Sequence, residues 1–406
     1  MSTAPIRLVA GDARPAPPHA ARARVWQNAR RVLAVRLDNL GDVLMTSPAL
    51  AALRDGLPQA HITLLATPSG AAAAAHLPML DATWSCRVPW MPTAATADRC
   101  AERGSEAALV ERLCAGAFDA AVIFTVCTQS ALPAALLCHM AGIPLRLAHC
   151  RENPYGLLSD WVPDPDRVEP GLLPLQQRQA ARHEVRRQLA LVGAVGLHTH
   201  DERLRFVLAG ADRRRAAEQL RAAGVPAARP YVVLHPGASA ASRRWPAAGF
   251  GSVARTLGSA GIAAVFCGSV DEAALVDEAL RAAEPAPPWS APVVSLAGAQ
   301  TLGELAATIA GADVLVANNS APAHLAAALG TPVVCLYAQT NPQHTPWRVR
   351  QRVLTHDVPC RWCLRSTCPQ GHHDCLQRIR PEQVVAAALE LMSSQPVTHS
   401  QPEVRA

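Results

Sequence analysis

The chain has 406 residues, of which 50% are hydrophobic, 4% aromatic and 17% charged, and its formal net charge is +6. This composition is typical of a globular protein with a large core, and the length allows two or three domains. All 38 basic residues are arginines, so a site that needs a fixed cation must use arginine. No dense basic stripe with interleaved aromatic residues is present, and we therefore expect no nucleic-acid partner.

Targeting and redox signals are weak. No apolar run reaches the roughly 18–20 residues that a membrane-spanning helix needs. Residues 1–30 lack the apolar segment of a signal peptide and are rich in Ala, Pro and Arg, which predicts a disordered extension. We therefore expect a cytoplasmic protein. Its twelve cysteines indicate free thiols or a metal site rather than a disulfide scaffold.

The chain continues with a first block of alternating strands and helices. We expect strands at 31–37, 61–66, 83–88, 120–124 and 144–149. The helices of this block are expected at 43–54, after Gly70, at 106–114 and at 130–141. Because the strand segments are apolar throughout rather than alternating, we expect parallel strands that are covered on both faces.

A less regular segment and a second block follow. We expect an Arg-rich helix at 176–191 and a domain junction around 195–228. The strands of the second block are expected at 231–234, 262–267, 293–296, 313–317 and 332–337. Its helices are expected from 246 and at 271–283, 302–310, 322–329 and 381–392, the last packing back on the first block. The two blocks predict an α/β fold with two doubly wound parallel sheets that face a cleft.

The stretch 313–347 is the most informative. An apolar strand ends in Asn319 and Ser320, and a helix that contains His324 begins at once. Polar groups at the carboxyl end of a parallel strand, next to a helix N-terminus, form an anion site. The alternatives are that Asn319 only caps the helix and that His324 is a packed histidine. The pattern predicts a site for a molecule that carries phosphate.

A second motif lies at the end of the first strand. Asp42 stands just before the expected helix, where it would face the cleft, and Gly41 permits a tight turn or a close approach of ligand. The alternative is that Asp42 is only an N-cap. The turn lacks the Gly-x-Gly-x-x-Gly pattern, so we do not expect a Rossmann dinucleotide site.

Two further motifs follow strands of the second block. The loop that begins at His235 is followed by Arg243 and Arg244, directly before a helix. Cations at a helix N-terminus oppose the helix dipole, so their presence indicates a polyanion between them and the helix; the alternative is solvated surface arginines. Asp271 and Glu272 follow the strand 262–267, where an acid either accepts from ribose hydroxyls or caps the helix.

The last motif is a cysteine cluster. Four cysteines lie within sixteen positions, beside a pair of histidines: Cys360, Cys363, Cys368 and Cys375. Four thiols at such spacing are suited to a structural zinc ion or an iron–sulfur cluster, although the spacing fits no standard finger or ferredoxin. Reduced structural cysteines are the alternative.

Together and in this order, the motifs resemble the ADP-heptose:lipopolysaccharide heptosyltransferases of glycosyltransferase family 9. The resemblance covers residues 31–391. It rests on Gly41-Asp42-Val43-Leu44, Ser47-Pro48-Ala49-Leu50, His235-Pro236-Gly237-Ala238, Arg244-Trp245-Pro246, the stretch 317–332 and the tail 368–376.

The resemblance implies a GT-B fold and inverting transfer from a nucleotide sugar, ADP-heptose in this family, to a lipopolysaccharide core or related glycan. It implies an acceptor-binding domain at 31–205 and a donor-binding domain at 206–380, after the extension 1–30 and before a C-terminal helix and tail at 381–406. No cofactor is required for transfer. The implied partners are a nucleotide-sugar donor, a lipid-linked glycan acceptor and, peripherally, the inner-membrane surface.

The resemblance also assigns residues. By motif match Asp42 would be the general base, and Arg243 takes the place of the family's diphosphate-binding lysine. Arg36 and Asn39 would bind the acceptor. The implied donor-binding residues are His235, Gly237, Ala238, Arg243, Arg244, Asp271, Asn319, Ser320, Ala321 and His324.

One departure from the family pattern concerns the donor. Asn319-Ser320-Ala321 stands where the family has Asp-Thr-Gly, which loosens the assignment of the sugar. Two alternatives therefore stay open. One is another GT-B nucleotide-sugar enzyme with a different donor or an epimerase activity, and the other is a nucleotide-sugar-binding scaffold that has lost catalysis.

Overall fold

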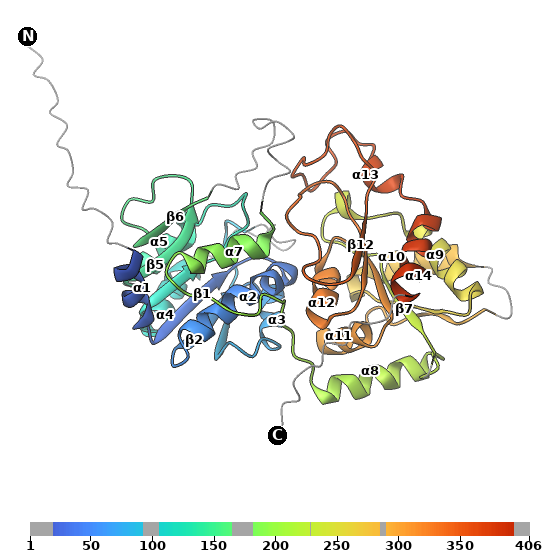
Figure 1. The fold of residues 1–406 in the computed structure, drawn as a ribbon, viewed down its shortest axis with the longest axis horizontal. Coiled ribbons are helices and arrows are strands. Elements are labelled where there is room, and N and C mark those ends of the chain that lie inside the picture. The colour runs from blue at the N-terminus through green and yellow to red at the C-terminus, as the bar shows by residue number, and fades with distance from the viewer. Residues whose placement is uncertain (1–18, 92–104, 165–181, 228, 285–289, 394–406) are drawn as a thin grey trace, which may run out of the picture.

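The computed structural model describes residues 19–91, 105–164, 182–227, 229–284 and 290–393. Two six-stranded parallel sheets lie side by side, each with helices packed on it (Figure 1). Their strand orders are β3-β2-β1-β4-β5-β6 and β12-β11-β10-β7-β8-β9. The predicted α/β fold with two doubly wound sheets is confirmed. Among the described residues, no helix combines the length and the apolar character that crossing a membrane requires.

The first domain is built on the sheet β1–β6. Its strands are β1 (Arg31–Arg36), β2 (His61–Ala66), β3 (Ala82–Ser85), β4 (Ala120–Ile123), β5 (Leu145–Cys150) and β6 (Asp160–Pro163). Its helices are α1 (His19–Gln27), α2 (Leu40–Gly56), α3 (Pro68–Ala74), α4 (Ser105–Ala115), α5 (Leu132–Met140) and α7 (Glu184–Gly193). The central strand β1 pairs with β2 and β4, and its apolar residues are buried on both faces, as expected for a covered parallel strand.

The second domain is built on the sheet β7–β12. Its strands are β7 (Tyr231–His235), β8 (Ala263–Phe266), β9 (Val293–Ser295), β10 (Val314–Asn318), β11 (Val333–Leu336) and β12 (Gln351–Leu354). Its α-helices are α8 (Gly210–Ala222), α9 (Ala247–Ser259), α10 (Ala273–Ala283), α11 (Leu302–Ala310), α12 (Ala321–Leu329), α13 (Asp374–Gln377) and α14 (Pro381–Ser393). Two short 3-10 helices precede α9 and α10: η1 (Ala241–Arg243) and η2 (Val270–Glu272).

The prediction of disorder through residue 30 is wrong for its last part. Helix α1 is ordered, and the Trp26 side chain is completely buried in the first domain. Its indole Nε1 donates a hydrogen bond of 3.1 Å to Asp160 Oδ2 on β6. Burial of this large aromatic side chain, with its N–H hydrogen-bonded, stabilises the segment. Composition alone does not reveal this, because most of the other residues of the segment are Ala, Pro and Arg. Residues 1–18 lie outside the described residues.

The last helix is not where the sequence led us to expect it. Helix α14 packs on α9 and on the strands β10, β11 and β12 of the second sheet, not on the first block (Figure 1). The expected helix 176–191 is ordered from Glu184 onward as α7, and residues 165–181 lie outside the described residues. The helix α8 and the edge strands β6 and β12 were not expected.

The strand orders place two functional edges opposite each other. In each sheet the order reverses once, between β1 and β4 in the first and between β7 and β10 in the second. Ligands of doubly wound sheets bind outside the carboxyl ends of the strands at such a reversal. Helix α2 of the first domain contacts α12 of the second, so the two edges face a common space.

Candidate active site

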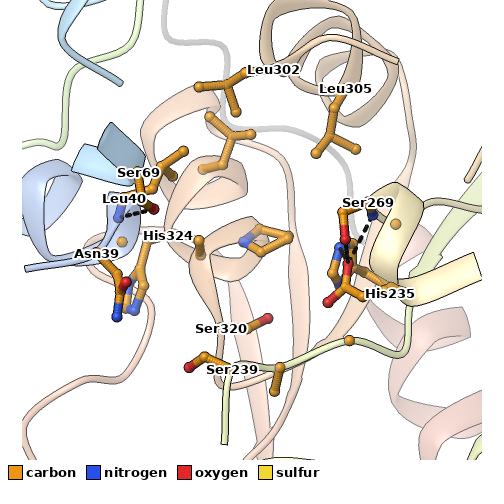
Figure 2. Close-up of a pocket in the computed structure, with 18 of the residues that line it drawn as sticks. Asn39, Leu40, Ser69, His235, Ser239, Ser269, Leu302, Leu305, Ser320 and His324 are labelled. Atoms are coloured by element: carbon orange, nitrogen blue, oxygen red, sulfur yellow. Dashed lines mark hydrogen bonds and ion pairs between the residues drawn. The ribbon is translucent and has the colours of Figure 1, made fainter. Parts of the chain in front are cut away.

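A cavity of about 410 Å³ lies between the two domains. Polar and charged side chains from both of them line it: Asn39, Asp42, Ser69, His235, Ser239, Arg243, Ser269, Glu272, Gln300, Thr301, Asn319, Ser320, His324 and His344. Figure 2 shows Asn39, Leu40 and Ser69 of the first domain on one side, His235 and Ser269 on the other, and Ser320 between them. The size and mixed lining are typical of a small-molecule site.

The start of α2 presents Asp42 to this cavity. Asn39 is the N-cap residue, and its backbone N–H donates to Asp42 Oδ2 at 3.3 Å. Asp42 is thus the third residue of the helix rather than its cap, and its carboxylate is both part of the helix start and part of the cavity wall. Leu40 N–H donates to Ser69 Oγ at 3.4 Å, which ties the turn after β1 to α3 (Figure 2).

A buried arginine stands behind Asp42. The Arg36 guanidinium is completely buried, and it lies 2.9 Å from Asp38 Oδ2, 3.4 Å from Asp42 Oδ1 and 3.1 Å from Glu184 Oε1. Burial raises the pKa of the Asp42 carboxyl, and the positive charge of Arg36 works against that rise. The prediction that Arg36 binds the acceptor is wrong, because its side chain has no surface to offer and is held by three carboxylates.

The loop after β7 packs against Glu272, one of the two acids that follow β8. His235 is buried, and its Nε2 lies 3.6 Å from Glu272 Oε2. A Cβ on Gly237 would lie 1.7 Å from Glu272 Oε1, so only glycine fits there with this carboxylate in place. Glu272 also accepts from Ser269 N–H at 2.9 Å, which caps η2. Asp271 is exposed and Glu272 lines the cavity, so the donor-binding role of Asp271 stays a prediction.

The two adjacent arginines have different surroundings. Arg243 ends η1 and lines the cavity, and its buried Nε has no hydrogen-bond partner among the described residues. Arg244 is exposed, and its Nε donates to the Ala238 carbonyl at 2.8 Å. Arg244 does not line the cavity, so its donor-binding role stays a prediction. Arg243 is left as a cation with donors to spare.

The start of α12 offers backbone N–H groups to the cavity. Ser320 is the N-cap residue, and its side chain makes no capping hydrogen bond; its Oγ donates to the Asn318 carbonyl at 3.2 Å instead. Asn319, Ser320 and Ala321 all line the cavity. An N-terminus without a side-chain cap leaves N–H donors and the positive end of the helix dipole available to an anion.

His324 lies beside this helix start and is neutral near pH 7. Burial, together with the nearby His344, His183 and Arg243, lowers its pKa to about 3. Its Nδ1 is buried and has no hydrogen-bond partner among the described residues. A Cβ on Gly41 would lie 3.1 Å from His324 Cδ2, so the glycine lets the two domains approach closely. His324 can therefore give a hydrogen bond to a ligand but no charge.

Sequence reasoning missed several residues that line or support the cavity. Gln300 and Thr301 line it from the turn before α11, and His344 lines it from the loop after β11. His344 lies in the stretch 313–347, but no strand or helix boundary marks it. Glu184 carried no local signal, because its role depends on α7 packing against α2 and β5.

The cysteine cluster does not have the predicted arrangement. Cys360 Sγ lies 3.8 Å from His372 Nε2, and the thiols of Cys360, Cys363, Cys368 and Cys375 are all free. Within the part of the chain that the structure describes, no three His, Cys, Asp or Glu side chains come together in a way that would hold a metal ion. The structure therefore gives no support to the metal-ligand prediction for these four residues.

Fold and cavity together define the GT-B class of protein, with two doubly wound domains and a cavity between them. Escherichia coli ADP-heptose lps heptosyltransferase II shares the fold, with a TM-score of 0.68 and 23% identity over 89% of this chain and 98% of that one. The family model Glycosyltransferase family 9 (heptosyltransferase) matches residues 107–373. The chain belongs to this family, as its motifs predicted.

Curated relatives agree with this family assignment. The chain is 30% identical to lipooligosaccharide heptosyltransferase 2 of Campylobacter jejuni subsp. jejuni serotype O:2 over 164 residues, or 40% of this chain and 50% of the relative. It is 24% identical to lipopolysaccharide heptosyltransferase 2 of Escherichia coli K12 over 87% of this chain and 96% of that protein. The first of these matches spans about half the length of the relative.

Proposed function

We propose that this protein is an inverting heptosyltransferase that moves heptose from ADP-heptose to a lipopolysaccharide core or related glycan. The observation that carries the proposal is the placement of Asp42 and Arg243 on opposite domains around one cavity. The names of the relatives, which include an ADP-heptose lps heptosyltransferase and a lipooligosaccharide heptosyltransferase, support the donor and the acceptor class.

In this proposal the second domain, residues 206–380, binds the donor. The diphosphate would lie between Arg243 and the start of α12, where the backbone N–H groups are without a side-chain cap. Charge builds up on the diphosphate as the sugar leaves, and donors that are already in place stabilise it most. Arg243 and the helix dipole supply this stabilisation, so the transfer is expected to need no metal.

The first domain, residues 31–205, would bind the acceptor and hold the base. Asp42 takes the proton of the acceptor hydroxyl, whose oxygen forms a bond to the anomeric carbon while the bond to the diphosphate breaks. The attack comes from the face opposite the leaving group, which inverts the anomeric configuration. Burial raises the pKa of Asp42, so the base becomes protonated at a higher pH than an ordinary aspartate does. Activity is therefore expected to be lost as the pH falls, starting above the pH at which an ordinary aspartate titrates.

The acceptor is bound at the first-domain side of the cavity, where Asn39 and Ser69 offer hydrogen-bonding groups. A lipid-linked acceptor implies that the protein works in the cytoplasm at the surface of the inner membrane. Sedimentation with vesicles that contain the acceptor lipid would measure this contact, and vesicles without the acceptor provide the control.

The experiment that tests the proposal is transfer by the purified protein from a panel of nucleotide sugars to extracted core acceptors. Mass spectrometry should show a mass gain of one heptose with ADP-heptose, and NMR of the product should show an inverted anomeric centre. Transfer of a different sugar would refute the donor assignment. The departure Asn319-Ser320-Ala321 would then be the first candidate to explain the different donor. Donor binding without transfer to any acceptor would support a scaffold that has lost catalysis.

A further inference from the structure

Glu184, the first residue of α7, is completely buried and lies behind the cavity wall without lining it. Its Oε1 accepts from Nη1 and Nη2 of Arg36, both at 3.1 Å, and from Gln188 Nε2 at 2.6 Å. A buried carboxylate costs folding free energy unless it is paired and hydrogen-bonded. The bonds from Arg36 and Gln188 offset this cost for Glu184 and fix the position of its carboxylate.

Glu184 and Asp42 share one nitrogen atom. Nη2 of Arg36 lies 3.1 Å from Glu184 Oε1 and 3.4 Å from Asp42 Oδ1. On the other edge of the guanidinium, Nε lies 2.9 Å from Asp38 Oδ2. Asp38 is fixed in turn by Gln129, whose Nε2 donates to Asp38 Oδ1 at 2.7 Å. The arginine is therefore held from two sides, and its remaining contact is with Asp42.

The charged groups around Asp42 come from several elements of both domains. Arg36 and Asp38 belong to β1 and the turn after it, Glu184 to α7, and Arg243 to η1 of the other domain. His324 on α12 and His344 after β11 line the same cavity. Burial lowers the pKa of both histidines, to about 3 for His324 and about 4 for His344, so neither carries a countercharge near pH 7.

The effect of Glu184 on Asp42 therefore has a definite sign. After burial, Arg36 is the strongest influence on the pKa of Asp42 and lowers it; Glu184 raises it, and Arg243 lowers it. Glu184 also neutralises part of the positive charge of Arg36, which weakens the attraction between Arg36 and the Asp42 carboxylate. Loss of the Glu184 charge lowers the pKa of Asp42 by both routes.

We propose that Glu184 is a positioning residue that acts through Arg36, orienting the Asp42 carboxylate toward the cavity and keeping it basic enough to take the acceptor proton. This role rests on the proposed function of Asp42 as the general base. Glu184 touches neither substrate; it sets the state of the group that does.

The test is the pH profile of kcat for Glu184→Gln, which keeps the shape of the side chain and removes its charge. The acid limb should move to lower pH by about one unit. Glu184 and Asp42 contact the same nitrogen of buried Arg36, and two charges in such a place interact more strongly than a pair at the surface. The plateau should fall about tenfold, because a weaker base is a poorer proton acceptor. Calorimetry should show ADP affinity within about twofold of the wild type, because Glu184 lies outside the cavity.

A second variant keeps the test decisive if Glu184→Gln does not fold, which thermal unfolding shows. Glu184→Asp retains the charge but withdraws it from Arg36 by one methylene group, so its acid limb should lie between those of the wild type and Glu184→Gln. An acid limb that stays in place in the folded variants overturns the proposal, whether the plateau falls or not. An acid limb that moves to higher pH overturns it as well.

Two controls separate this role from other causes. Glu218→Gln changes the same residue type at an exposed position of α8 and should leave the profile in place. Asp42→Asn separates the two proposals: if it keeps near-normal turnover, the function proposed for Asp42 fails, whatever Glu184 does. If Asp42→Asn is inactive and Glu184→Gln leaves the acid limb unmoved, only the role of Glu184 fails.

Discussion

The two halves of the cavity use charge in opposite ways. On the first domain, Asp42 belongs to a buried network of carboxylates around Arg36, in which every group is fixed by a partner. On the second domain, Arg243 and the start of α12 keep donors without protein partners among the described residues. A base must be tuned before the substrate arrives, whereas a diphosphate site must leave its donors free for the ligand. The difference teaches which half acts on a proton and which on an anion.

The largest effect on ADP affinity is expected at Arg243. Arg243→Ala removes the charge that faces the cavity, and we expect ADP affinity to fall about 100-fold, the range of a charge-assisted contact in a desolvated site. Arg244→Ala is the matched control: the same residue type one position along, exposed and bonded to the Ala238 carbonyl. Isothermal titration calorimetry with ADP measures both, and equal losses would contradict the distinction between the two arginines.

A smaller loss is expected from Gly237→Ala. The new Cβ would fall 1.7 Å from Glu272 Oε1, so the carboxylate must move and give up its hydrogen bond with Ser269 N–H. We expect donor affinity to fall about tenfold, the cost of one misplaced polar contact in the cavity. Gly156→Ala, at a glycine with open space around it, should leave affinity unchanged. Unaltered ADP binding in Gly237→Ala would show that Glu272 does not shape the donor half.

The sequence predicted the features that depend on local patterns and missed those that depend on contacts between distant residues. Apolar runs fix strands locally, so β2 was predicted at its observed limits, and polar residues just after strands pointed to Asp42 and Asn319. Arg36 was misplaced because an arginine looks like a surface residue until its partner is known. That partner, Glu184, lies 148 positions away and meets it only through the packing of α7. Local patterns reveal a site's edge, and long-range ion pairs do not appear in them.

The same limit applies to elements that pack at a distance. Helix α14 was predicted nearly at its observed limits, yet its place on the second sheet was not. Its buried residues, such as Val384 and Leu391, identify an apolar face, but either sheet offers an apolar surface to receive it. The choice depends on complementarity with α9 and β10, which no local pattern encodes.

Acid should weaken the contact between the two domains. Burial lowers the pKa of His183 and His344 to about 4 and that of His324 to about 3, while unfolded histidines titrate near 6.5. The unfolded chain then binds more protons between these values, so stability is full above about pH 6.5 and falls as pH decreases toward 4. Each histidine contributes up to about 1.4 kcal/mol per pH unit. Thermal unfolding against pH measures this slope, which His344→Gln should reduce; an identical slope in the variant would remove His344 from the account.

The smallest effect is expected from Gly41→Ala. Its Cβ would lie 3.1 Å from His324 Cδ2 and 3.3 Å from Ala321 Cα. To relieve these close contacts, the two domains must move apart by a few tenths of an ångström. We expect kcat to fall about two- to threefold while the fold is retained, because a slight misplacement of the two halves lowers the rate of transfer. Steady-state kinetics would show it. A tenfold loss would mean that the domains cannot adjust at all.

The most direct test of the central claim, that the base on one domain works against a diphosphate held by the other, is turnover of Asp42→Asn. The substitution keeps the size of the side chain and removes its capacity to accept the proton. With ADP-heptose and a core acceptor, we expect kcat to fall by about 10²- to 10⁴-fold while calorimetry shows unchanged ADP affinity. Near-normal turnover in a correctly folded Asp42→Asn would contradict the account.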